Sequence, residues 1–227
     1  ILVDNSKSKL DKLKNKLLKK KINFNLFYSD LEKESERLLL INSVYKLYNS
    51  LDIIINNAGF VGQSKLDGWN TKFANQSLNT WKRAFEVNLT APFHLVQSFE
   101  KLLNNSKNPS IINISSIYGE LGPKWHLYDG TKMGNPAAYA ASKGGLLQFT
   151  RWLAITLAPK IRVNAVCLGG VLNNQPNIFV KKYEKEVPLN RMANDEDLMG
   201  TIMLLASDMS LYITGQSVKV DGGWSSW

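Results

Sequence analysis

Residues 110–143 read SIINISSIYGELGPKWHLYDGTKMGNPAAYAASK, which is an apolar strand, a long loop and the start of a helix. The helix carries Tyr139 and Lys143, and side chains four residues apart lie one turn apart on the same helix face. A positive charge beside a tyrosine favours the phenolate, so we expect Lys143 to lower the pKa of the Tyr139 phenol. A serine at the end of the strand would hold a substrate oxygen at the same point. The stretch therefore predicts a proton-transfer site for alcohol and carbonyl chemistry.

Short apolar strands alternate with helices on both sides of this stretch. We expect strands at residues 1–4, 22–27, 51–55, 110–115, 161–168 and 216–220. We expect helices after residue 6 and at residues 31–50, 77–103, 136–159, 179–185 and 195–207. Such alternation predicts an α/β fold with a parallel sheet covered on both faces. No repeat or linker divides the 227 residues, so a single domain, 1–227, is expected.

Composition argues against several classes of protein. No apolar run reaches the ~18 residues that a membrane span needs, and lysines rather than an apolar core follow the first residues. We therefore expect no membrane association and no secretory signal, and the single cysteine, Cys167, fits a cytoplasmic location. Eight lysines in residues 1–21 hold most of the +9 net charge at helical spacing, which predicts a solvated helix face and no nucleic-acid surface. No metal site is expected.

Polar and small residues close the predicted strands, where ligands of open parallel sheets bind. A carboxylate at Asp4 would accept from both ribose hydroxyls of an adenosine and repel a 2′-phosphate, which favours NAD over NADP. The alternative is an ordinary aspartate at a helix start. Asp30 would accept from an adenine amino group or cap a helix. The tetrapeptide Asn56-Asn57-Ala58-Gly59 suits close approach of a flat ligand to the backbone, and an ordinary turn is its alternative.

Pro92 lies four residues after Asn88 within the predicted helix 77–103. Proline lacks an N–H and clashes with the carbonyl four residues earlier, so we expect the helix to kink. The freed carbonyl of Asn88 would hold a water in a proton relay that ends at Lys143. A kink that only shapes packing is the alternative.

These residues, with Asp221-Gly222-Gly223 near the end of the chain, resemble the short-chain dehydrogenase/reductases. The resemblance implies a Rossmann-like, doubly wound parallel sheet that binds NAD(P)(H). It implies that Tyr139 is the general acid/base, that Lys143 lowers its pKa and holds the nicotinamide ribose, that Ser116 polarises the substrate oxygen and that Asn88 completes a water relay. The positions that it places against the cofactor are Asp4, Asp30, Leu31, Asn57, Ala58, Gly59, Tyr139, Lys143 and Val171. It also implies homodimers or homotetramers that pair through the helices of Asn88 and Tyr139.

The chain departs from the family at its start. The family's first strand, Gly-rich turn and first helix, roughly 30 residues by the size of such a unit, are not present before Ile1. We therefore expect a truncated sheet without the backbone cradle and helix N-terminus that hold a pyrophosphate. A truncated homologue without catalytic activity is one alternative to an enzyme.

An insertion at residues 121–135 separates Ser116 from Tyr139 and must border the pocket. It contains Trp125, His126 and Tyr128, which we take as candidate substrate contacts, although His126 equally suits a surface loop. Aromatic and hydrogen-bonding groups suit a polar ring such as a sugar, whereas an acyl thioester would favour apolar walls. The segment resembles oxidoreductases of bacterial flagellin and surface-glycan modification.

The sequence thus predicts an NAD(H)-dependent oxidoreductase that interconverts an alcohol and a ketone on a small sugar-derived substrate, such as an amino sugar or nucleotide sugar. A reductase of 3-oxoacyl carriers is the alternative within enzymes.

Overall fold

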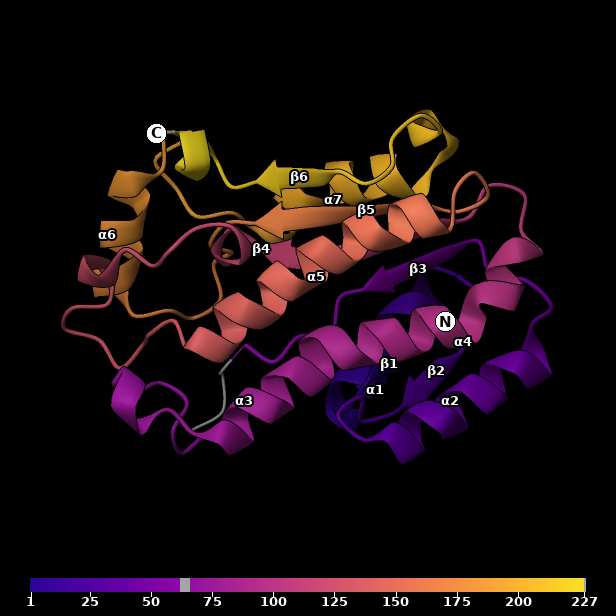
Figure 1. Cartoon of the computed structure of the whole chain (residues 1–227), viewed down its shortest axis with the longest axis horizontal. Helices are drawn as coiled ribbons and strands as arrows, with labels where there is room; N and C mark the ends of the chain where they lie inside the picture. Colours follow the sequence, from indigo (N-terminus) through magenta and orange to yellow (C-terminus); the bar gives the residue numbers. More distant parts are fainter. Residues whose placement is uncertain (62–65, 227) are drawn as a thin grey trace.

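The computed structural model describes residues 1–61 and 66–226, which form an arrangement of parallel strands and covering helices (Figure 1). The strands in this part of the chain are β1 (Leu2–Asp4), β2 (Leu26–Tyr28), β3 (Ile53–Asn56), β4 (Ser110–Ser116), β5 (Arg162–Leu168) and β6 (Ser217–Val220). The α-helices are α1 (Lys7–Lys19), α2 (Glu34–Leu47), α3 (Leu78–Phe85), α4 (Ala91–Asn104), α5 (Ala137–Thr156), α6 (Asn177–Glu186) and α7 (Asp195–Ala206). The α/β class and the parallel pairing predicted from the sequence are confirmed.

The centre of the fold is a four-stranded parallel sheet in the order β3-β4-β5-β6. Every residue of β4 is buried, because helices cover both of its faces. Ile111 packs with Val96 of α4 and Leu153 of α5, whereas its neighbour Ile112 points to the other face and packs with Leu205 of α7. Successive side chains of a strand alternate between faces, so these two clusters are the two layers of the core.

A separate two-stranded sheet, β1-β2, lies beyond β3, on the side away from β6, together with α1 and α2 (Figure 1). Val3 of β1 and Phe27 of β2 pack in one cluster with Leu40 of α2, Phe99 of α4 and Ile54 of β3. Among the described residues no ladder pairs β1 with β3, so the sheet is divided at the place where the first strand of a doubly wound fold would lie.

The helix expected at residues 77–103 is interrupted. A π-helical turn, Glu86–Thr90, separates α3 from α4, and the N–H of Ala91 donates to the carbonyl of Glu86, five residues back. Pro92 follows in the first turn of α4, so the interruption falls where the missing proline N–H predicted one.

The other expected elements hold to within about three residues, with one larger difference at β2. The strand expected at 22–27 begins only at Leu26, because its partner β1 offers three residues for pairing and the register starts at Leu2 opposite Leu26. Within the described residues, no helix combines the length and the apolar character that crossing a membrane requires.

Candidate active site

Ser116 ends β4, and Tyr139 and Lys143 lie in the first two turns of α5. Two hydrogen bonds fix the helix to the strand: Ser115 Oγ donates to the carbonyl of Lys143 at 3.1 Å, and Lys143 Nζ donates to the carbonyl of Ile114 at 2.7 Å. Gly119 lets the chain after β4 approach the helix, since a Cβ there would lie 3.0 Å from the Lys143 carbonyl. The catalytic candidates of strand and helix are therefore held together by hydrogen bonds from side chains to backbone carbonyls.

Burial dominates the electrostatics of this pair. It raises the pKa of the Tyr139 phenol, and a hydrogen bond from Ser116 lowers it in part. Burial also lowers the pKa of Lys143 to about 8. The pKa of the Tyr139 phenol is therefore raised overall, because burial outweighs the lowering effect of Ser116, while the ammonium of Lys143 donates to a strand carbonyl. That Lys143 lowers the pKa of Tyr139 stays a prediction.

Asn88 is buried in the π-helical turn, and its side chain joins two other segments. Its Oδ1 accepts from the N–H of Phe60 at 2.7 Å, and its Nδ2 donates to Ser142 Oγ at 2.9 Å. Gly59 lies beside them, since a Cβ there would be 3.7 Å from both Asn88 Oδ1 and Lys143 Nζ. The structure thus brings Asn88, Gly59 and Lys143 together; the proposed water relay through the Asn88 carbonyl stays a prediction.

The other expected cofactor positions lie at or after the carboxyl ends of strands, which share one edge within each sheet because the ladders are parallel. Asp4 Oδ1 accepts from the N–H of Ser6 at 2.7 Å, before α1. Asp30 Oδ1 accepts from the N–H of Glu32 at 3.2 Å, in the turn before α2. Val171 forms a bridge with Ala193 beyond β5. Asn57 and Ala58 follow β3 on the way to Gly59.

A buried arginine, which the sequence did not indicate as a site residue, connects two of the segments around the candidate site. Arg37 is 2% exposed; its guanidinium donates to the carbonyl of Leu31 at 2.5 Å and pairs with Glu86 at 2.7 Å. Its Nε donates to His94 Nδ1 at 3.1 Å. Arg37 thereby ties the turn that contains Asp30 to the π-helical turn, and no sequence pattern around it distinguishes it from a surface arginine.

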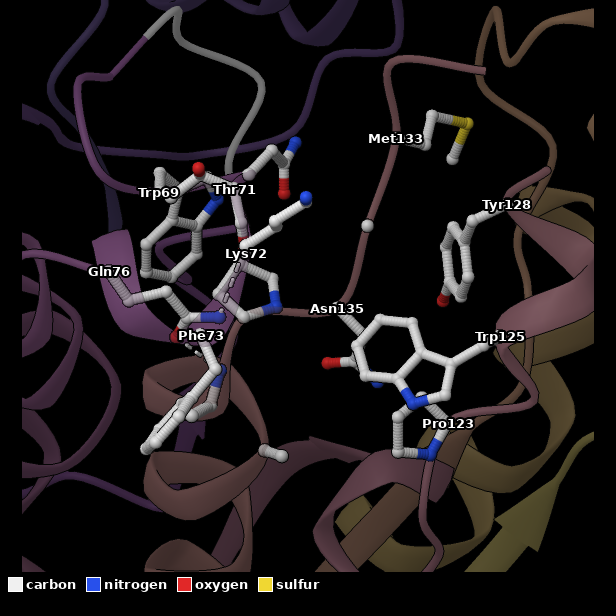
Figure 2. A pocket seen from close by; sticks show the side chains of 15 residues that line it. Trp69, Thr71, Lys72, Phe73, Gln76, Pro123, Trp125, Tyr128, Met133 and Asn135 are labelled. Carbon is white, nitrogen blue, oxygen red and sulfur yellow. Dashed lines mark hydrogen bonds between the residues drawn. The ribbon is translucent and has the colours of Figure 1, made fainter. Parts of the chain in front are cut away.

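A cavity of about 560 Å³ opens beside the first turn of α5 (Figure 2). Trp125 and Tyr128 of the insertion form one wall, and Trp69 and Lys72 of the loop before α3 form the other. The insertion therefore borders the cavity, and the role of its residues in substrate binding stays a prediction. His126 does not line this space: its side chain is 57% exposed, and its Nε2 lies 3.0 Å from a carboxylate oxygen of α6.

Hydrogen bonds and an ion pair hold the insertion, residues 121–135, in place beside the candidate site. Tyr128 donates its hydroxyl proton to the Tyr118 hydroxyl at 3.0 Å, and burial raises the pKa of both phenols, so both stay neutral at pH 7. Lys124 Nζ lies 2.5 Å from Glu186 Oε2. Lys182 Nζ donates to the carbonyls of His126 and Asp129 at 2.9 and 3.0 Å. Helix α6 is thus the support of the insertion.

Comparison with known proteins gives consistent matches. The family described as enoyl-(acyl carrier protein) reductase, a short-chain dehydrogenase/reductase group, matches residues 1–225. A post-translational flagellin modification protein A of Campylobacter coli is 34% identical over 185 residues, which cover 81% of this chain and 71% of the relative. A 3-oxoacyl-(acyl-carrier-protein) reductase of Aquifex aeolicus is 32% identical over 185 residues, which cover 79% of this chain and 68% of the relative.

Solved structures share the fold over nearly the whole chain. A short-chain dehydrogenase of Leptospira borgpetersenii with bound NAD+ is 29% identical with a TM-score of 0.83, covering 99% of this chain and 91% of the other. A gluconate 5-dehydrogenase of Burkholderia cenocepacia with NADP and tartrate is 23% identical with a TM-score of 0.82, covering 100% and 86%, and shows the fold alone.

Proposed function

Because the chain belongs to the short-chain dehydrogenase/reductase family of oxidoreductases, we propose that it interconverts an alcohol and a ketone on a sugar-derived substrate with NAD(H). One observation carries the proposal: Ser116, Tyr139 and Lys143 converge at the end of β4, and a cavity walled by aromatic and amide side chains adjoins the same turn of α5. The aromatic rings offer faces for a sugar ring, and the amides offer hydrogen bonds.

The residues around Lys143 fit a nicotinamide dinucleotide. Gly59 has no side chain to fill the space beside the ammonium, and any group larger than a methyl there would meet Lys143 or Asn88. In this proposal Lys143 binds the nicotinamide ribose. Asp4 binds the adenosine ribose, Asp30 binds the adenine amino group, and the backbone of the turn after β3 lies against the cofactor. The carboxylate of Asp4 favours NAD(H), since it would repel the 2′-phosphate of NADP(H). The cofactor, when bound, supplies or accepts the hydride.

The chain's own residues handle the proton. Burial keeps the Tyr139 phenol protonated at neutral pH, so in the reducing direction it gives the substrate oxygen its proton while Ser116 donates a hydrogen bond to that oxygen. In the oxidising direction Tyr139 takes the hydroxyl proton, and the balance is alcohol plus NAD+ to ketone, NADH and one proton. Lys143, whose pKa burial lowers to about 8, favours the phenolate electrostatically when it carries its charge.

The two groups of relatives support different substrates. Similarity to a flagellin modification protein supports a glycan precursor, and similarity to 3-oxoacyl carrier reductases supports an acyl thioester. The cavity wall of Trp125, Tyr128 and Asn135 favours the glycan precursor, because an acyl chain would leave the buried amide of Asn135 without hydrogen-bond partners.

We also propose a homo-oligomer that pairs through α4 and α5, which lie on one face (Figure 1). Phe93, Trp152 and Ile155 are 45%, 58% and 81% exposed on these helices, and exposed apolar groups of this size mark interaction surfaces.

The test is a turnover assay with NADH and NAD+ against amino sugars, hexonic acids, nucleotide sugars and acetoacetyl thioesters. We expect turnover of a sugar-derived substrate and a loss of about 10²–10⁴-fold in kcat in Tyr139→Phe, the range for a general acid/base, with unchanged NADH binding. Turnover of thioesters alone would select the acyl-carrier alternative. Absence of NADH binding by calorimetry would select the non-catalytic alternative.

A further inference from the structure

Two side chains in the cavity bury polar atoms that lack hydrogen-bond partners within residues 1–61 and 66–226. They are the indole N–H of Trp69 and both ends of the Asn135 amide, Oδ1 and Nδ2. Trp69 is 2% exposed and Asn135 is 7% exposed, so bulk water does not solvate them freely. An unsatisfied buried donor or acceptor costs about 1–3 kcal/mol, so three such atoms around one cavity need an explanation.

Both residues line the same cavity beside Tyr139. Figure 2 shows Trp69 in one wall and Asn135 between that wall and Trp125. Asn135 lies four residues before Tyr139, at the point where the insertion enters α5. Trp69 belongs to the cluster against which Tyr139 packs, so a ligand bound to both Trp69 and Asn135 would lie close to the candidate catalytic tyrosine.

The ring of Trp69 and the backbone of Asn135 are held in place before any ligand binds. The ring of Trp69 packs edge-on against Phe60, with centroids 4.9 Å apart at 84°. The carbonyl of Gly68, next to Trp69, accepts from the N–H of Ser77 at 2.9 Å. Asn135 precedes Pro136, which restricts its backbone to extended conformations. Preorganised polar groups of this kind lose little entropy on binding, which is typical of recognition sites.

The donors and acceptors define the ligand that would satisfy them. The indole N–H donates only, whereas the asparagine amide both donates and accepts. The ligand must present an acceptor to Trp69 and a neighbouring donor–acceptor pair to Asn135. An acylamino group on a sugar ring meets this requirement, as does a pair of adjacent ring hydroxyls, while an apolar acyl chain does not.

We propose that Trp69 and Asn135 form the specificity site of this protein and recognise an acylamino group or a vicinal diol on a polar ring. The proposal deepens the proposed function and rests on it for the reaction, but the binding event is measurable without turnover. A substituent that hydrogen-bonds to both side chains is expected to bind more tightly than its deoxy analogue, because the analogue leaves the buried polar groups unpaired.

The experiment is an NMR titration of the ¹⁵N-labelled chain in the presence of NADH. The indole resonance of Trp69 is identified by its absence in Trp69→Phe. The probes are N-acetylglucosamine, glucose, 2-deoxyglucose and the S-ethyl thioester of acetoacetate, which contains no amide. We expect this resonance to shift with N-acetylglucosamine or glucose, and with 2-deoxyglucose only at about tenfold higher concentration or more. A larger response to N-acetylglucosamine than to glucose assigns the acylamino group, and equal responses assign the diol.

Variants of the second residue separate recognition from general damage. Asn135→Leu is expected to weaken binding of the responding sugar about tenfold or more, whereas Asn70→Leu, an exposed amide of the same cavity, weakens it far less. If Asn135→Leu lowers the melting temperature, Asn135→Asp replaces it in the test. This variant keeps the shape and an acceptor but loses the N–H donor, so it is also expected to weaken binding. Sugar binding without turnover would defeat the proposed function and leave this site standing. Equal binding by Asn135→Leu, or no shift with either sugar, would overturn the site.

Discussion

Asn88 Nδ2 donates to Ser142 Oγ at 2.9 Å, across 54 positions of sequence, and so joins the π-helical turn to the helix that carries Tyr139 and Lys143. The Oδ1 of the same amide holds the N–H of Phe60, just after Gly59. One buried side chain thus fixes three segments that meet at the candidate active site. The spacing of four residues between Asn88 and Pro92 predicted a kinked helix, and the structure shows that the Asn88 side chain bonds to Phe60 and Ser142.

Asn88→Ala is the first prediction. It removes the side-chain hydrogen bonds of Asn88 to Phe60 and Ser142 and leaves the Phe60 N–H unpaired, so we expect the free energy of unfolding in urea to fall by about 2–4 kcal/mol. Misplacement of α5 is expected to lower kcat by about 100-fold. Asn79→Ala, an exposed position on α3, is the control and leaves both values nearly unchanged. An unchanged urea midpoint in Asn88→Ala would show that the hydrogen bonds of the Asn88 side chain do not contribute to stability.

The second prediction concerns the buried charge of Lys143. Burial lowers its pKa from 10.5 to about 8, so between these values the folded state binds fewer protons than the unfolded state and stability rises with pH. The cost of the buried ammonium is therefore full below pH 8. Lys143→Met relieves it and is expected to raise the free energy of unfolding at pH 7 by up to about 3 kcal/mol, the equivalent of that pKa shift.

Urea unfolding of the chain without cofactor at pH 7 and at pH 10 measures this effect. The advantage of Lys143→Met should shrink at the higher pH, where the wild-type lysine loses its charge, while turnover is lost at both. Lys101→Met, an exposed lysine of α4, should show the same small difference at both pH values. A constant advantage for Lys143→Met would contradict the buried-charge explanation.

The sequence predicted the fold better than it predicted the electrostatics. Alternation of apolar strands with helices is a local pattern, so the parallel sheet and most element bounds followed from it. Gly59 and Ser116, which follow or end neighbouring parallel strands, lie beside Lys143 and Tyr139 of α5, as expected for strands that end at one edge. The raised pKa of Tyr139 did not follow, because it depends on how much protein covers the phenol.

The second wall of the cavity was also beyond the sequence. Trp69 and Lys72 come from a loop that no motif marks, and only its long-range packing places it against residues 123–136. Asn135 lies inside the predicted insertion, in which the sequence points to Trp125, His126 and Tyr128 as substrate contacts. An asparagine before a proline is ordinary in sequence, and only its burial without partners distinguishes it.

The third prediction tests the support of the insertion. Glu186 pairs with Lys124 and His126, and these contacts hold the carboxyl pKa below its usual range, Lys124 being the larger cause. Glu186→Gln is expected to loosen the wall and to raise KM several-fold with little change in kcat. Surface ion pairs contribute little stability, so the free energy of unfolding should fall by less than about 1 kcal/mol. Glu184→Gln, on the same helix, is the control; equal KM values in the two variants would remove α6 from substrate binding.

The fourth prediction concerns assembly. Charge on the apolar face of α4 and α5 should oppose pairing, so Trp152→Glu with Ile155→Glu is expected to shift the protein to a monomer in light scattering. Leu39→Glu with Leu38→Glu, on exposed positions of α2, adds the same charge elsewhere and should leave the mass unchanged. A monomeric wild type would refute the proposed assembly. Loss of assembly in the control alone would place the interface on another surface.

The fifth prediction concerns the choice of cofactor at Asp4. Its Oδ1 holds the N–H of Ser6 at the start of α1, and the helix that follows carries a series of lysines. The carboxylate thus supplies negative charge at the edge of a positive region. Asp4→Asn keeps an oxygen for the Ser6 N–H and removes the charge, so a 2′-phosphate would meet the lysines without the opposing carboxylate.

We expect the ratio of kcat/KM for NADH over that for NADPH to fall at least about tenfold in Asp4→Asn, since one unit charge at 4 Å near a protein surface is worth up to about 4 kcal/mol. Added salt should reduce the difference, because the interaction is electrostatic and exposed. Asp11→Asn, on α1 itself, makes the same change in net charge at an exposed position and is expected to alter the ratio far less. If both variants shift the ratio equally, the preference comes from the overall positive field of α1, and Asp4 does not contact the ribose.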